Sequence, residues 1–260
     1  MKTGQTYWEH AAQVLQQKPP DRLWRRHSDA LDSLLLDRWL PRETAGLLLK
    51  TDMYDESLGA GITLPARASA WKTVGMDIAA DMLFAARRVS GRHCLAATDI
   101  RHLAFAENSF EAIFSNSTLD HFGSVAQIVR SIDECYRILK PGGHFILTLD
   151  NPFNPVIALR QMLPYWLLVK LGITTFYYGK TLAPGRLRQL LVAAGFTVRH
   201  MEAILHCPRI LAILASRIID NRAPDNGKER FLSVLNRFEK LGRLPTRFIS
   251  GYFIAVCCRK

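Results

Sequence analysis

From residue 45 onward, short apolar runs alternate with segments of helical pattern, and this alternation constrains the fold more than any other feature. Runs of strand length lie at 45–50, 72–78, 94–100, 111–117, 144–150, 196–203 and 251–259. Continuous apolar runs are typical of strands that helices bury on both faces of a parallel sheet. The sequence therefore predicts an α/β fold with a mostly parallel seven-stranded sheet, in which the two C-terminal strands are the expected antiparallel additions.

The composition is that of a globular chain, with 260 residues of which 48% are hydrophobic and 22% charged. The N-terminus has no signal-peptide pattern, and no run approaches the roughly 18–20 apolar residues of a membrane span. The five cysteines are odd in number and lack paired metal-ligand spacing, which indicates reduced thiols. We therefore expect a soluble cytoplasmic protein without stable membrane insertion.

A formal net charge of +11 raises the question of nucleic-acid binding. The basic residues are scattered, with short clusters at 22–27 and 185–189 but no long Lys/Arg run and no aromatic–basic repeat. We interpret the charge as a solvated surface and expect no nucleic-acid partner.

Two segments differ from the alternating pattern. The first forty residues have apolar positions at helical spacing and are interrupted by prolines. We expect an N-terminal helical cap over 1–43 and a main domain over 44–260. Within that domain, the stretch 151–182 is apolar, rich in aromatic residues and broken by prolines, so we expect an inserted lid there.

Acidic residues follow two of the predicted strands. The carboxyl ends of parallel strands line one crevice, where ligands bind. Asp77 ends the second strand, and its carboxylate can accept hydrogen bonds from both hydroxyls of a ribose or can cap the next helix. Asp99 can accept a hydrogen bond from an exocyclic adenine amine, with Ile100 against the ring. These residues indicate a nucleoside-containing ligand.

Three segments occur in a diagnostic order: VGMDIA at 74–79, TDIRHLAFAENSFEAIFSNSTLDHF at 98–122, and DECYRILKPGGHFILT at 133–148. This order resembles class I S-adenosylmethionine-dependent methyltransferases, in particular the branch that methylates small molecules such as quinones and polyketide-type products. The third segment is the most specific, because it combines a helix end, a Pro-Gly-Gly turn and a buried strand.

The resemblance implies a Rossmann-like class I methyltransferase fold with S-adenosyl-L-methionine as cofactor. It covers 44–148 well and does not explain the first forty residues or 151–178. Carried over by position, it implies these cofactor-binding residues: Asp77 with Ile78 at the ribose, Asp99 and Ile100 at the adenine, and Ser115 and Asn116 at the methionine end.

The stretch 50–61, KTDMYDESLGAG, departs from the family pattern of an acidic residue and a Gly-x-Gly turn after the first strand. We interpret it as a substituted cofactor loop in which Thr51 and Asp52 contact the amino-acid end, because a carboxylate suits an ammonium group. Gly59 and Gly61 would shape the following helix. A metal cluster, an acidic surface turn and a loss of cofactor binding are the alternatives. We expect no metal, since the spacing matches no calcium loop.

Methyl transfer requires mainly alignment of the acceptor, and a base helps when the acceptor is a hydroxyl. His121 lies beyond the fourth strand and is the candidate base, with Asp120 as its orienting partner. The alternative is that both residues have structural roles at the start of a helix.

Polar and aromatic residues at 151–182 suit a hydrophobic acceptor, or else form the lid's own core or a contact in a homodimer. The expected acceptor-binding residues are Asn151, Tyr165, Trp166, Tyr177 and Tyr178.

The sequence thus predicts an S-adenosylmethionine-dependent methyltransferase that methylates oxygen or carbon of a hydrophobic small molecule in secondary or quinone-type metabolism. One alternative is a methyltransferase-fold protein without methyl transfer, either a partner subunit or a catalyst of another reaction such as cyclisation. Another is an RNA methyltransferase, which would need a basic surface around the crevice.

Overall fold

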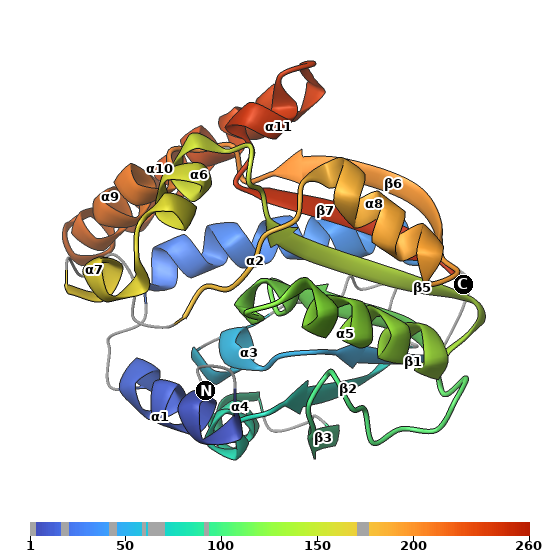
Figure 1. The fold of residues 1–260 in the computed structure, drawn as a ribbon. Coiled ribbons are helices and arrows are strands. Elements are labelled where there is room, and N and C mark those ends of the chain that lie inside the picture. The colour runs from blue at the N-terminus through green and yellow to red at the C-terminus, as the bar shows by residue number, and fades with distance from the viewer. Residues whose placement is uncertain are drawn as a thin grey trace.

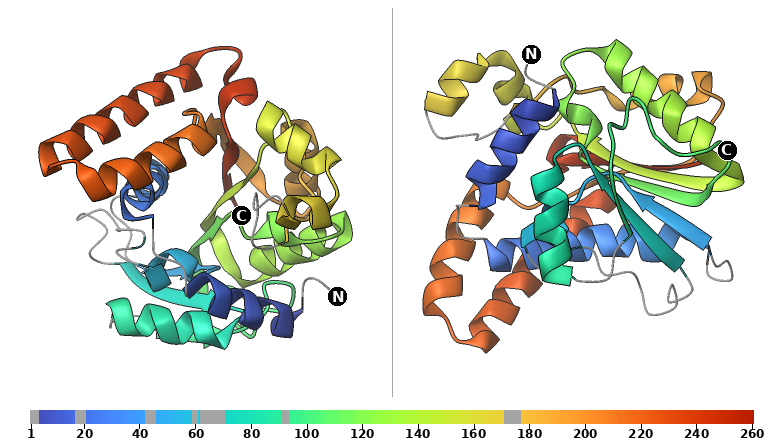
Figure 2. Two further views of the ribbon diagram at one scale, coloured as in Figure 1. Left: turned by 90° about the vertical axis from the view of Figure 1, so that its left-hand side faces the viewer. Right: turned by 90° about the horizontal axis from the view of Figure 1, so that it is seen from below.

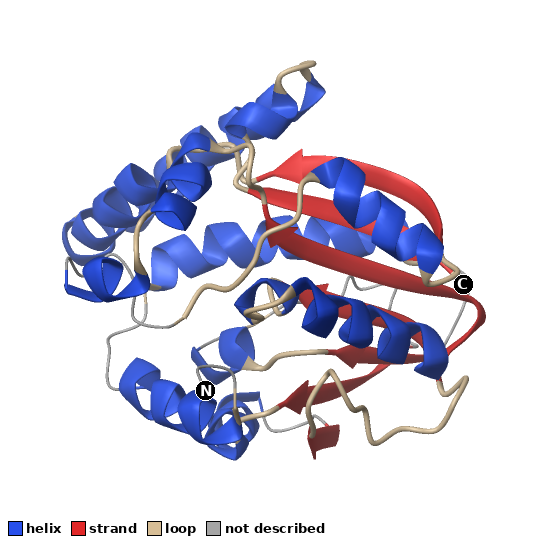
Figure 3. Cartoon of the chain, viewed as in Figure 1, coloured by secondary structure: helices blue, strands red, loops and turns tan. Residues whose placement is uncertain are grey.

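The computed structural model describes residues 4–16, 21–41, 46–58, 61, 71–90, 94–170 and 177–260. These residues form a seven-stranded sheet in the order β3-β2-β1-β4-β5-β7-β6, with helices on both faces (Figures 1 and 3). The strands are β1 (Gly46–Lys50), β2 (Trp71–Asp77), β3 (Cys94–Ala97), β4 (Phe110–Asn116), β5 (Leu139–Asp150), β6 (Thr197–Ile204) and β7 (Phe253–Arg259). The predicted α/β class and mostly parallel sheet are confirmed.

Strand β7 is antiparallel to both of its neighbours, β5 and β6, whereas the pairs among β1, β2, β3, β4 and β5 are parallel. Strand β6 therefore runs in the same direction as β5, and the expectation that both C-terminal strands are antiparallel is wrong for β6. Helix α8 (Pro184–Ala193) precedes β6 as a crossover. After β6 the helices stay near its carboxyl end, so β7 begins at that edge and runs back (Figure 1).

The remaining helices are α1 (Gln5–Gln16), α2 (Arg22–Trp39), α3 (Tyr54–Leu58), α4 (Ala80–Ser90), η2 (Leu119–His121), α5 (Val125–Ile138), α6 (Pro155–Met162), α7 (Tyr165–Lys170), α9 (Arg209–Arg222), α10 (Asp225–Phe238), η3 (Glu239–Arg243) and α11 (Arg247–Ser250). Helices α5 and α8 cover one face of the sheet, and α2 lies across the other (Figures 1 and 2). Among the described helices, none combines the length and the apolar character that a membrane crossing requires.

The pleat of the strands distributes side chains between the two faces. Ile113 and Phe145 belong to the core beneath α5 and α8, whereas their neighbours Phe114 and Ile146 pack with Leu36 of α2. Helix α2 thus shares the core of the sheet, although we expected residues 1–43 to form a cap. The boundary at 43 stays a prediction.

The predicted Pro-Gly-Gly turn lies inside β5 rather than before it. The pairing of β4 with β5 jumps from Phe110–Leu139 to Ala112–His144, so the turn forms an irregularity within the strand. Gly142 has a φ of 79°, a left-handed conformation that glycine adopts without steric cost. The strand resumes its regular pairing at His144.

The strand order reverses between β1 and β4, and the carboxyl ends of these strands therefore diverge around a crevice. Lys50, Asp77, Asn116 and Asp150 end β1, β2, β4 and β5 at this edge. A ligand site is expected there.

Candidate cofactor and acceptor site

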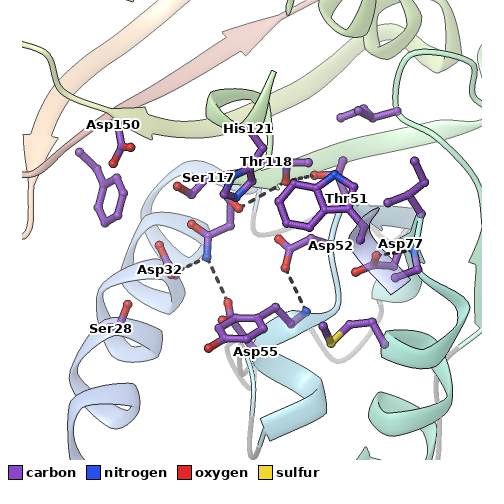
Figure 4. Close-up of a pocket in the computed structure, with 18 of the residues that line it drawn as sticks. Ser28, Asp32, Thr51, Asp52, Asp55, Asp77, Ser117, Thr118, His121 and Asp150 are labelled. Atoms are coloured by element: carbon purple, nitrogen blue, oxygen red, sulfur yellow. Dashed lines mark hydrogen bonds between the residues drawn. The ribbon is translucent and has the colours of Figure 1, made fainter. Parts of the chain in front are cut away.

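A cavity of about 1450 Å³, including the solvent at its mouth, lies at this edge and is also bordered by α1, α2 and α9 (Figure 4). The structure brings the following predicted site residues to its lining: Thr51, Asp52, Asp77, Ile78, Asp99, Ile100, Asn116, His121 and Tyr178. Ser115, Asp120, Asn151, Tyr165, Trp166 and Tyr177 are not among the lining residues. Gly59 lies outside the described residues.

Asp77 is fixed by two backbone amides. Its Oδ1 accepts a hydrogen bond from the amide of Ala79 at 2.9 Å, and its Oδ2 accepts one from Met53 at 3.1 Å. Each carboxylate oxygen keeps a second lone pair, so the group can still accept from ribose hydroxyls. Burial raises the pKa of Asp77. The geometry thus accommodates both the predicted ribose contact and the capping alternative.

The carboxylate of Asp99 already accepts hydrogen bonds from a neighbouring side chain. The guanidinium of Arg101 donates to both of its oxygens, and the Arg101 amide donates to Oδ1 at 2.9 Å. Although burial raises the pKa of Asp99, these hydrogen bonds lower it below its ordinary value. An adenine amine would therefore compete with Arg101. The adjacent Ile78 and Ile100 provide an apolar wall for a ring.

Asp52 has one oxygen bound and one without a partner. Its Oδ1 accepts a hydrogen bond from the Tyr54 amide at 3.0 Å. Its Oδ2 is buried, has no hydrogen bond within the described chain, and lies 3.8 Å from Nζ of Lys50. Burial raises the pKa of Asp52 to about 7. A buried carboxylate oxygen without a donor is costly, and an ammonium group entering the cavity would satisfy it.

The other acids of this loop are buried in ion pairs. Glu56 binds Lys50 at 2.8 Å, and Asp55 binds Arg25 of α2. The Asn116 amide donates to Asp55 at 3.1 Å and to Asp32 of α2 at 3.0 Å (Figure 4). The interpretation of the loop 50–61 as an acidic surface turn is therefore wrong. No cluster of three His, Cys, Asp or Glu side chains suited to a metal occurs in the described ranges.

Gly61 has a direct conformational reason to be glycine. Its φ is 60°, and an added Cβ would approach Cγ of Glu56 to 2.7 Å. The absence of a Cβ at Gly61 therefore leaves room for the Glu56 side chain that pairs with Lys50. Thr51, on the other side of the loop, shares a hydrogen bond of 2.9 Å with Thr118.

Ser115 and Asn116 are neighbours in β4, but only Asn116 lines the cavity. Asn116 reaches the cavity, and its Oδ1 accepts a hydrogen bond from Oγ1 of Thr148 at 2.8 Å. Ser115 is fully buried in β4, and its Oγ has no hydrogen bond with the described residues. Successive strand side chains point to opposite faces, and the structure does not bring Ser115 to the cavity.

The surroundings of His121 favour the neutral imidazole. Its Nδ1 lies 3.0 Å from the carbonyl oxygen of Tyr177, so Nδ1 carries the proton and Nε2 keeps a lone pair. Burial lowers the pKa of His121 below 6.5. Its ring lies edge-on to Trp8 of α1 with centroids 4.8 Å apart. His121 lines the cavity, so a bound acceptor can lie beside its imidazole.

Asp120 supports the backbone around His121 rather than the ring nitrogen that carries the proton. Its Oδ2 accepts hydrogen bonds from Oγ of Ser117 at 2.7 Å and from the Asp150 amide at 3.1 Å. Its Oδ1 is 3.9 Å from Nε2 of His121. Burial and the nearby Asp150 carboxylate raise the pKa of Asp120 well above its ordinary value.

The predicted acceptor residues divide into two groups. Tyr178 lines the cavity, and the guanidinium carbon of Arg160 lies 3.8 Å from its ring centroid. Tyr165 and Tyr177 instead contact Tyr7 of α1: the Tyr177 amide donates to the Tyr7 hydroxyl at 2.7 Å. They join the lid segment to α1.

Asn151 and Trp166 have other environments. Asn151 is fully buried, and its Nδ2 donates to the carbonyl of Gly251 at 2.8 Å, which ties β5 to the start of β7. The Trp166 side chain is 65% exposed.

Sequence reasoning missed the contributions of two helices. Arg25 and Asp32 reach the cavity from α2, and Arg209 reaches it from α9. The basic cluster 22–27 was interpreted as a solvated surface, but Arg25 pairs with Asp29 at 2.7 Å and also with Asp55. The spacing i, i+4, i+7 of Arg25, Asp29 and Asp32 places them on one helix face and was an available signal.

Comparisons with known proteins agree with this geometry. Residues 57–147 match a family model described as a methyltransferase domain. A demethylmenaquinone methyltransferase of Symbiobacterium thermophilum is 31% identical over 160 residues, which cover 52% of this chain and 62% of that protein. The chain thus spans less than two thirds of that relative's length.

Solved structures show the same fold. A S-adenosylmethionine-dependent methyltransferase from Mesorhizobium loti aligns with a TM-score of 0.51 and 17% identity, over 87% of this chain and 96% of that one. The cyclase SpnF aligns with a TM-score of 0.52 and 19% identity, over 89% of this chain and 80% of that one.

Strand order, cavity position and the solved neighbours define the fold class: the chain has the class I methyltransferase fold, and its residues 57–147 are similar to a methyltransferase domain. The resemblance predicted from the sequence, to the small-molecule branch of S-adenosylmethionine-dependent methyltransferases, is confirmed by the demethylmenaquinone methyltransferase relative.

Proposed function

We propose that this protein is an S-adenosylmethionine-dependent methyltransferase that acts on a hydrophobic, quinone-type small molecule. The observation that carries the proposal is the buried Oδ2 of Asp52, which accepts no hydrogen bond from the described residues; Asp52 lines the same cavity as Asp77 at the point where the strand order reverses. One acid suits the ammonium of the cofactor and the other its ribose. The match to a methyltransferase domain supports this choice of ligand.

In this proposal, Asp77 binds the ribose, Ile78 and Ile100 enclose the adenine, and Asp52 binds the amino-acid end. The cofactor supplies a methyl group already activated on a sulfonium, so the protein chiefly excludes water and aligns the acceptor. Thr51 and Asn116 border the same end of the cavity. The N-terminal residues 1–43 and the segment 151–182 would serve to cover the cavity.

The acceptor is a small molecule rather than nucleic acid in this proposal. Of the arginines that line the cavity, Arg25 is already paired with Asp29 and Asp55, so the lining offers a phosphate backbone few cationic contacts. Trp24, Tyr178 and Phe253 provide apolar surface for a ring system. The demethylmenaquinone methyltransferase relative supports a quinone-type acceptor. A homodimer and a cytoplasmic location remain parts of the proposal.

His121 is the proposed general base. Its Nε2 lone pair can accept a proton from an acceptor hydroxyl, while Tyr177 holds the Nδ1–H and thus the ring orientation. Asp120 is a positioning residue, because it fixes the backbone that carries His121.

A reaction without methyl transfer, such as cyclisation, is the second candidate. It is favoured by the displacement of the Gly-x-Gly sequence, which directly follows the first strand in the family pattern but stands at 59–61 here, and the cyclase SpnF shares the fold. An incubation with methyl-labelled S-adenosylmethionine and reduced demethylmenaquinone separates the two. We expect label in the naphthoquinol, and none when RNA replaces it. Saturable cofactor binding without transfer of label would contradict the methyltransferase proposal and favour the second candidate.

A further inference from the structure

Arg209 is a cation without an anionic partner in the part of the chain that is described. Its guanidinium carbon lies 4.4 Å from the ring centroid of Tyr252, 5.4 Å from that of Phe253 and 5.9 Å from that of Trp24. It lines the cavity, and no hydrogen bond or ion pair joins it to another described residue. Aromatic faces attract the charge but offer no strong hydrogen-bond acceptor to its N–H groups.

The position of Arg209 is not explained by helix stability. It is the first residue of α9, where the helix dipole favours negative charge and disfavours a cation. The nearby carboxylate of Asp150 is bound to Arg160, which also stacks on Tyr178. The guanidinium therefore retains donors that can bind a ligand in the cavity.

This end of the cavity is distinct from the proposed cofactor end. Arg209 stands beside Phe253 at the start of β7, which pairs with Asp150 at the end of β5. Asp52 and Asp77 follow β1 and β2, on the other side of the central β4. Figure 4 shows Asp150 and Asp77 at opposite sides of the cavity.

The walls around Arg209 are apolar and aromatic. The cavity-lining residues of this end include Trp24, Leu31, Tyr178, Ile204, Leu205 and Phe253. A planar hydrophobic molecule can lie against these side chains, and a single negative oxygen on it would find the guanidinium donors. Charge-assisted hydrogen bonds to arginine are shorter and stronger than neutral ones.

We propose that Arg209 is a specificity-determining residue that anchors an anionic oxygen, either an ionised hydroxyl or a carboxylate, on a planar hydrophobic acceptor. The identity of this ligand as the methyl acceptor rests on the proposed function. The anionic group is an anchor and not the reacting atom, which faces His121 and the cofactor end.

Equilibrium binding of three naphthalene-based probes tests the proposal. Hydroxynaphthoquinone is ionised at neutral pH, its methoxy derivative is neutral, and naphthoic acid carries a carboxylate. Wild-type protein is expected to bind at least one of the two anions about tenfold or more tightly than the neutral probe. The tighter anion identifies whether the anchor suits a hydroxyl oxygen or a carboxylate.

Variants assign the preference to Arg209. Arg209→Met keeps an apolar stem and should abolish the preference, whereas Arg209→Lys should retain part of it. Arg222→Met, at the exposed other end of α9, is the matched control and should behave as wild type. Circular dichroism and melting temperature establish that each variant is folded.

Two results overturn the proposal: equal wild-type affinity for the neutral and both anionic probes, or an anion preference that survives in Arg209→Met. Titration with S-adenosylmethionine is performed in parallel. Anion preference without cofactor binding would contradict the proposed function and leave the anion site intact, so the two failures are distinguishable.

Discussion

The two ends of the cavity differ in charge and in how that charge is compensated. At the β1–β2 end, Asp52 and Asp77 lie beside Lys50, and one oxygen of Asp52 lacks a donor. At the β5–β7 end, Arg209 lies among aromatic rings and lacks an acceptor. One end thus has an acceptor for a further cationic donor, and the other has donors for an anionic group. Under the two proposals, the cavity takes two ligands of opposite local charge, and His121 is among the residues that line it.

The largest expected effect is on turnover, when the proposed base His121 is replaced. His121→Ala should lower turnover by about two to four orders of magnitude, because a proton transfer is lost, and should leave cofactor affinity near the wild-type value. Only neutral His121 is a base, and burial lowers its pKa, so the wild-type rate should rise with pH through a value below 6.5 and then level off. Turnover measured against pH checks this.

The control for His121 is His102→Ala, an exposed histidine that does not line the cavity. An acceptor that is a carbon nucleophile acidified by carbonyl groups would need no base. A His121→Ala variant within a few-fold of wild type, with the same pH profile, would leave catalysis to alignment alone.

A change at the ribose position tests the cofactor end. Asp77→Ala should weaken S-adenosylmethionine binding by about 1–3 kcal/mol, or about 5- to 150-fold, because ligand hydroxyls lose their acceptor. Calorimetry on folded protein measures the loss. Asp81→Ala, on α4 and outside the cavity lining, should bind as wild type. Unchanged affinity in Asp77→Ala would refute the ribose assignment.

The contribution of the loop 50–61 to cofactor binding can be measured separately from that of Asp77. Asp52→Asn should reduce S-adenosylmethionine affinity about tenfold, because a charged hydrogen bond to the ammonium becomes a neutral one. Adenosine lacks the amino-acid moiety, so its affinity should be nearly unchanged. Equal losses for both ligands in parallel titrations would mean that the loop acts through the fold and not through contact.

Asp52→Asn should lower cofactor affinity but raise the stability of the ligand-free protein. Since burial raises the pKa of Asp52 from 3.8 to about 7, its stability contribution is complete below 3.8 and is lost as pH rises through about 7. Ligand-free Asp52→Asn should therefore melt a few degrees above wild type at pH 8 and match it at pH 4. A variant that melts lower than wild type at pH 8 would show that the carboxylate is stabilised in the ligand-free protein.

The smallest effect is expected at the adenine position. Asp99 already binds Arg101 through both oxygens, so Asp99→Asn should change S-adenosylmethionine affinity by less than about threefold. Calorimetry beside Asp77→Ala gives the comparison. A loss as large as that of Asp77→Ala would show that the adenine amine displaces Arg101.

The sheet was predictable because its signal is local. The buried run at 111–117 is β4 at 110–116, and the run at 251–259 is β7 at 253–259. Parallel strands present their carboxyl ends at one edge, which is why Asp77 and Ile100 reach the same cavity. The apolar runs alone predict where these strands end, and no information on long-range packing is needed.

The rest of the site depends on information that the pattern lacks. The predicted strand at 111–117 did not tell whether Ser115 or Asn116 faces the cavity, because a shift of one residue reverses the face of a strand side chain. Arg25 and Arg209 come from helices far apart in the chain, and only tertiary packing brings them to the lining of one cavity. The direction of β6 likewise depends on how α8 crosses the sheet.

The proposed function depends most directly on cofactor binding, since the Gly-x-Gly turn of the family pattern does not directly follow β1. Calorimetric titration of the wild-type protein with S-adenosylmethionine measures this. We predict saturable binding of one molecule per chain, competition by S-adenosylhomocysteine, and loss of affinity in both Asp77→Ala and Asp52→Asn. Absence of binding up to about 1 mM cofactor, in protein that melts cooperatively, would contradict the account.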